Sequence, residues 1–175
     1  MAERDEKGAA AREFRTSLAA QQAARVVVET ARQCGLVDGA LVVDPALAEM
    51  EKSLFAAMFK VVARRGAAEL TSDEFGSMFT FVFARAAEAA TACWSKRPFE
   101  TGTDGLFDGK TPFYAPDGLK GYVHGLDFPE RCAQNCWDLY AAEGAGDPLL
   151  RLFESLKWCF RIGCHASLRF LETHR

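Results

Sequence analysis

The residues best suited to chemistry are cysteines in the C-terminal part of the chain. Cys132 and Cys136 are four positions apart, one helical turn, and Cys159 and Cys164 lie with His165 in a later segment. Thiolates and an imidazole bind zinc or iron when a fold brings them together. Their spacing differs from the tight C-x2-C knuckles of structural zinc sites, and cysteines buried as small apolar residues give the same pattern. These five residues are therefore weak metal-ligand candidates. No residue is assigned a catalytic role, and the sequence indicates no particular cofactor.

A segment between residues 97 and 127 interrupts an otherwise helical pattern. It holds nearly half of the 14 glycines and half of the 6 prolines of the chain. Its Asp-Gly pairs, of which Asp104 and Gly105 are the first, favour turns because Asp bonds its local backbone and Gly accepts a positive φ. We expect an ordered loop or a short β-ribbon. Ordered loops of this length often act as lids or binding segments, although aromatic side chains packed over a helix would explain the same composition.

Six side chains in or near this loop are predicted to contact a ligand or a partner. Tryptophan and tyrosine rings line apolar pockets, and a histidine in a loop can act as a general base or bind a ligand. Each also has a structural interpretation, since large aromatic rings anchor helix packing and a histidine in a turn bonds the backbone. The six residues are Trp94, Phe113, Tyr114, Tyr122, His124 and Trp137.

The rest of the chain predicts an all-α bundle of about five helices. Asp44 and Asp147 each precede a proline, which is typical of a helix start because Asp caps free amides and proline needs no partner at the first position. Thr71 and Glu74 have the spacing of a capping box. With glycines as stop signals, the predicted helices run over about residues 9–34, 45–65, 72–95, 128–143 and 148–171.

The second and third predicted helices carry more apolar surface than one buried stripe requires. Between Ser53 and Ala63 the only charged residue is Lys60, and Phe81 lies outside the main apolar stripe of the third helix. A fold of this size can enclose only one or two helices on all sides. The excess therefore predicts a homodimer built partly on these two helices.

Composition describes an ordinary globular domain. Apolar residues make up 49% and charged residues 26%, and the net charge of −3 gives no basic field for nucleic acid or anionic membrane. The charged N-terminal residues do not form a signal peptide, and no apolar run reaches the ~18 residues of a membrane-spanning helix. We expect one domain over residues 1–175, with residues 1–8 disordered, in the cytoplasm, and with reduced cysteines.

Three functions fit these observations. The leading hypothesis is a non-enzymatic helical interaction or regulatory protein, homodimeric, which contacts a partner through the aromatic loop and the apolar helix surface. The alternative is a sensor that binds a small apolar or aromatic molecule, or a cofactor, in a pocket between helices closed by the 97–127 loop. The third is a metal- or thiol-dependent enzyme using the four C-terminal cysteines. The glycine-rich phosphate loops of nucleotide-binding proteins and the Glu-x-x-His motifs of di-iron bundles are absent from the sequence.

Overall fold

The computed structural model describes residues 44–65, 70–107 and 148–173, together with Arg25, Glu29 and Trp137. These residues form three long helices, α2 (Pro45–Arg65), α3 (Ser72–Trp94) and α6 (Pro148–Thr173). No strand occurs among the described residues, so this part of the chain is all-α, as the sequence predicts. Arg25, Glu29 and Trp137 are each helical, but the predicted helices around them otherwise lie outside the described residues. The total of five helices stays a prediction.

The start of α2 follows from its first residues. The Asp44 side-chain oxygen accepts a hydrogen bond from the Ala46 amide at 2.8 Å, and the Asp44 carbonyl accepts one from Ala48 at 2.9 Å. Pro45 occupies the first helical position, where an amide hydrogen would have no partner. The predicted helix start is confirmed.

The start of α3 is the predicted capping box. Thr71 accepts a hydrogen bond from the Glu74 amide at 3.2 Å through its hydroxyl, and the Glu74 carboxylate accepts one from the Thr71 amide at 3.1 Å. The Glu74 carboxylate also forms an ion pair with Arg65 at the end of α2. One residue therefore caps α3 and joins it to the preceding helix.

The end of α3 is a left-handed turn built on a lysine. Lys96 has φ 52°, the Lys96 amide donates to Cys93 at 3.3 Å, and the Arg97 amide donates to Ala92 at 2.8 Å. These two bonds are those of the Schellman motif, which usually places glycine at the left-handed position. The helix ends at Trp94, within the predicted limits.

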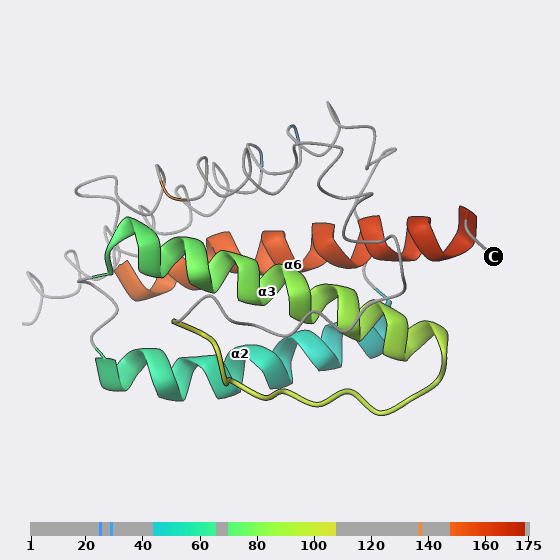
Figure 1. Cartoon of the computed structure of the whole chain (residues 1–175), viewed down its shortest axis with the longest axis horizontal. Coiled ribbons are helices and arrows are strands. Elements are labelled where there is room, and N and C mark those ends of the chain that lie inside the picture. Colours follow the sequence, from blue (N-terminus) through green and yellow to red (C-terminus); the bar gives the residue numbers. More distant parts are fainter. Residues whose placement is uncertain are drawn as a thin grey trace, which may run out of the picture.

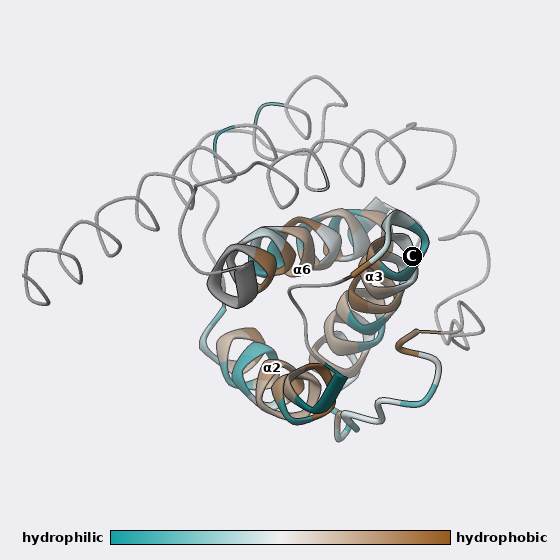
Figure 2. Cartoon of the chain, turned by 90° about the vertical axis from the view of Figure 1, so that its left-hand side faces the viewer, coloured by the Kyte–Doolittle hydropathy of each residue, from teal (hydrophilic) through white to brown (hydrophobic). Residues whose placement is uncertain are grey.

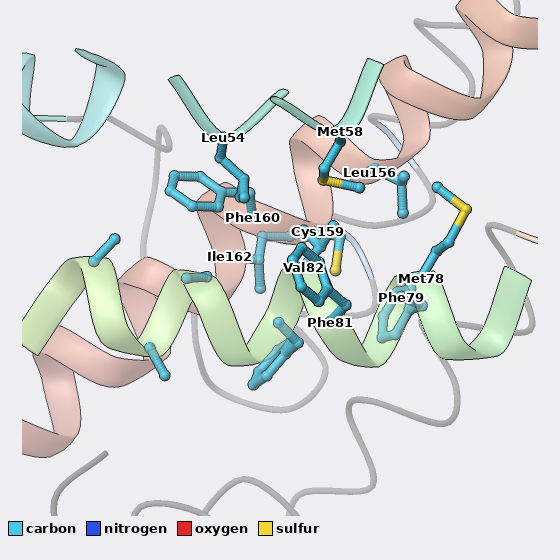
Figure 3. Close-up of a cluster of buried hydrophobic side chains, with 14 of the residues drawn as sticks. Leu54, Met58, Met78, Phe79, Phe81, Val82, Leu156, Cys159, Phe160 and Ile162 are labelled. Carbon is cyan, nitrogen blue, oxygen red and sulfur yellow. The ribbon is translucent and has the colours of Figure 1, made fainter. Parts of the chain in front are cut away.

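The three helices surround a shared core (Figures 1 and 2). The contact between α3 and α6 is the most extensive, and α2 packs against both. Figure 3 shows side chains from all three helices meeting in this core. The labelled residues are Leu54 and Met58 of α2, Met78, Phe79, Phe81 and Val82 of α3, and Leu156, Cys159, Phe160 and Ile162 of α6.

The two helices with excess apolar surface have different positions in the bundle. On α3, 13 of the 23 residues are buried, and Phe81 is fully buried, so the apolar surface of this helix is used within the chain. On α2, buried residues are restricted to one face, and the helix lies at the edge of the three-helix group in Figure 1. Burial inside the chain therefore explains the composition of α3, and on α2 it leaves Phe59 as the large apolar side chain that stays exposed.

The described part of the loop, residues 97–107, packs on the bundle. Gly105 has φ 87° in the turn that begins at Asp104, which confirms the turn predicted for this Asp-Gly pair. Leu106 is buried, Phe107 packs against the core, and the Arg65 guanidinium lies 4.9 Å from the centre of the Phe107 ring. No strand occurs in residues 97–107. The remainder of the predicted loop or β-ribbon lies outside the described residues.

None of the described helices contains an apolar stretch long enough to cross a bilayer.

Candidate functional site

Three phenylalanine rings form a partly exposed surface where α2 meets α6. Phe153 of α6 lies 5.7 Å from Phe55 and 5.8 Å from Phe59, both of α2, measured between ring centroids. Phe55 also makes an edge contact with the buried Phe160 at 6.2 Å. Phe59 remains 48% exposed. We call Phe55, Phe59 and Phe153 the aromatic ledge. Its rings pack on one another and on the core, so that Phe59 is held in place while one side of it faces outward.

The outward side of α2 continues from this ledge. We call this surface the α2 face, and its exposed residues recur at three- and four-residue spacing because a helix has 3.6 residues per turn. Glu49 and Lys52 on it form an exposed ion pair at 2.9 Å, and the hydrogen bond and charge of Glu49 raise the pKa of Lys52. The residues of the α2 face are Ala46, Glu49, Lys52, Ser53, Ala56, Phe59, Lys60 and Ala63.

An ion pair between helices fixes α2 against α6. The Glu51 carboxylate accepts hydrogen bonds from Arg161 at 3.0 Å from Nε and 3.3 Å from Nη2, and Glu51 is only 8% exposed. The Arg161 guanidinium also lies 5.2 Å from the Trp158 ring centre. Two parallel bonds from a planar guanidinium restrict the relative position of the helices. Sequence reasoning missed this pair because its members are 110 positions apart.

A second, more deeply buried ion pair lies within α3. Arg85 and Glu88 contact each other one helical turn apart, and the Arg85 guanidinium lies 5.1 Å from the Phe81 ring centre. Arg85 Nε and Glu88 Oε1 are buried and have no hydrogen-bond partner among the residues that the structure describes. A Cβ added to Gly102 would approach Arg85 Nη2 at 4.0 Å, so the segment after α3 passes close to the pair. The pair lies in the interior under this segment, and it was not predicted from the sequence.

The described cysteines of α6 are buried. Cys159 is fully buried in the core, and the Cys164 thiol donates to the Ala86 carbonyl at 3.5 Å. Burial raises the pKa of Cys164 well above its ordinary value, and the charges of Glu51 and Cys93 add to this effect. A thiol with a raised pKa is a poor nucleophile and a poor metal ligand, because both roles require the thiolate.

Among the residues that the structure describes, no group of three or more His, Cys, Asp or Glu is placed to hold a metal ion. His165 is half-buried on α6. Cys132 and Cys136 lie outside the described residues, so the convergence of the four cysteines stays a prediction.

The predicted aromatic contacts fall into three groups. Trp94, at the end of α3, is 39% exposed. Trp137 packs against the core, with its ring 5.5 Å from that of Phe75. The other four, Phe113, Tyr114, Tyr122 and His124, lie outside the described residues. Trp94 and Trp137 thus have different environments, one at the surface and one packed against the core.

Comparison of the chain with models of known protein families, with curated proteins and with solved structures gives no match. The α2 face and the aromatic ledge form the candidate functional site. They combine an outward aromatic ring, small side chains and charges of both signs. Aromatic rings are enriched in the centres of protein interfaces, and polar and charged groups lie in their rims.

Proposed function

We propose that this protein is a non-enzymatic helical interaction or regulatory protein that acts as a homodimer and binds through its apolar helix surface. The observation that carries the proposal is Phe59, which is 48% exposed although its ring packs against Phe153. Single exposed apolar residues are common on monomers, but this ring is part of an ordered cluster. A ring already held in place loses little conformational entropy when a partner covers it.

The position of α2 favours the α2 face over an interaction surface built from α2 and α3 together. Apart from Cys93 and Trp94 at its C-terminal end, the apolar residues of α3 are buried inside the chain, whereas Ala56, Phe59 and Ala63 of α2 are exposed. The proposed interaction therefore uses α2 and the neighbouring Phe153, rather than α2 and α3 together. The aromatic loop beyond residue 107 is a second proposed contact.

The other two hypotheses have less support from the described residues. A thiol-dependent enzyme needs a reactive thiolate, and the burial of Cys164 with a raised pKa disfavours one at that position. A ligand sensor needs a pocket closed by Tyr114, Tyr122 and His124, and this hypothesis stays a prediction.

Native mass spectrometry of the full chain tests the proposal. We expect a dimer at micromolar concentration, and a monomer that keeps its helical circular dichroism spectrum after Phe59→Ser, since the ring is 48% exposed and lies outside the buried core. Trp94→Ser is the matched control, because Trp94 is the other large exposed apolar side chain among the described residues and lies on α3, outside the α2 face. A wild-type chain that stays monomeric, or a dimer that survives Phe59→Ser, contradicts the proposal.

A further inference from the structure

We infer that the α2 face binds the α2 face of a second copy, with the two helices antiparallel and Glu49 of each copy opposite Lys60 of the other. This inference rests on the proposed function, and it specifies the partner and its orientation. It follows from the order of exposed charges along α2, the positions of its small residues and the placement of the aromatic ledge.

The exposed charges differ between the two halves of α2. The N-terminal half begins after the exposed Asp44 and carries Glu49 with its ion-pair partner Lys52, whereas the C-terminal half carries only positive charges, Lys60, Arg64 and Arg65. A parallel pair of α2 helices would place Glu49 beside Glu49 and Lys60 beside Lys60. An antiparallel pair places opposite charges together and also opposes the two helix dipoles, so the charges favour the antiparallel arrangement.

Small residues permit a close approach in the same register. When Glu49 of one helix lies opposite Lys60 of the other, Ser53 lies opposite Ala56 near the two-fold axis. All four positions are exposed on α2. Toward each end of the helix pair, Ala63 of one helix lies opposite Ala46 in the first turn of the other. Helix axes can approach closely only where side chains are small, so this register satisfies both sterics and charge.

The aromatic ledge then lies on one side of the helix pair and the ion pairs on the other. At about 100° per residue, Glu49 and Lys60 are on one flank of Ala56, and Phe59 is on the opposite flank. A two-fold axis perpendicular to the helices keeps the two Phe59 rings on the same side. Each ring is placed to cover the N-terminal half of the other α2, and Phe153 extends the contact onto α6.

Charge-reversal variants test this arrangement in the full chain. Glu49→Lys would place two lysines opposite each other at both ends of the interface, and Lys60→Glu would place two glutamates there. We expect each variant to raise the dimer Kd at least tenfold in sedimentation equilibrium. The double variant restores opposite charges, and its Kd should return to within about threefold of wild type. Mixing the two single variants should give a mixed dimer tighter than either variant alone.

Two controls separate this inference from the proposed function. Glu172→Lys changes the net charge as Glu49→Lys does, but at an exposed position near the end of α6, and it should leave the Kd unchanged. Circular dichroism checks that all variants remain helical. A dimer that is lost with Phe59→Ser but is not rescued by the double reversal would overturn the antiparallel register and leave the proposed function standing. A wild-type monomer would overturn both.

Discussion

Gly163 of α6 lies directly against Ala86 of α3. A Cβ added to Gly163 would be 2.8 Å from the Cβ of Ala86 and 3.5 Å from the Phe83 ring. Real Cβ atoms do not approach this closely, so the contact between these two helices requires a glycine here. The extensive packing of α3 on α6 depends on this approach.

Gly163→Ala should therefore lower stability although alanine favours helices. The gain in helix propensity is about 1 kcal/mol, and overpacking a core typically costs about 1–3 kcal/mol. We expect a net loss of about 1 kcal/mol in chemical denaturation, for which the sign is the decisive result. Gly76→Ala is the matched control, since an added Cβ meets nothing within 4 Å on α3 and should stabilise the protein by about 0.5–1 kcal/mol.

The sequence could predict the ends of the helices because caps are local. Asp44 bonds a residue two positions away, and Thr71 and Glu74 bond each other across three. It could not predict which apolar helix would be central. The burial of Phe81 depends on segments far apart in the chain, and no local pattern distinguishes a helix enclosed by its own fold from one whose apolar face stays outside.

The same limit applies to the candidate site. Phe55 and Phe59 could be recognised as surplus apolar residues of one helix, but the ledge also needs Phe153 of α6. The pair of Glu51 and Arg161 likewise joins two helices that the sequence does not place beside each other. Contacts within a helix follow from spacing, whereas contacts between helices require the packing order.

The Glu51–Arg161 pair should contribute measurable stability, because Glu51 is buried and accepts two hydrogen bonds. We expect Glu51→Ala to lower the free energy of unfolding by about 2 kcal/mol, and a double-mutant cycle with Arg161→Ala to give a coupling of about 1–2 kcal/mol. Glu49→Gln, which removes the exposed pair with Lys52, should have no detectable effect at concentrations where the chain is monomeric. Additive effects of the Glu51 and Arg161 changes would show that the pair is not coupled.

Lys96→Gly should stabilise the protein. Lys96 has φ 52°, a left-handed conformation that costs about 1 kcal/mol for a residue with a Cβ and little for glycine. The backbone bonds of the turn do not involve the lysine side chain, so they remain in the variant. Thermal denaturation should show a higher Tm for Lys96→Gly and no gain for Lys96→Ala, which keeps the Cβ. Equal effects of the two substitutions would mean that the lysine side chain, and not the backbone, sets the stability of this turn.

Stability should fall at alkaline pH because of Cys164. Burial, with smaller effects from Glu51 and Cys93, raises the pKa of Cys164 well above its ordinary value of about 8.5. Above that value the unfolded chain loses the thiol proton while the folded chain keeps it. The contribution of this thiol to the free energy of unfolding is therefore complete below about pH 8 and declines as the pH rises, by up to about 1.4 kcal/mol per pH unit.

Urea denaturation between pH 7 and pH 10 should show a steeper decline in stability for wild type than for Cys164→Ala. Cys93→Ala, which removes a thiol with far less burial, should retain most of the wild-type slope. Parallel curves for wild type and Cys164→Ala would show that the Cys164 thiol ionises as readily in the folded protein as in the unfolded chain.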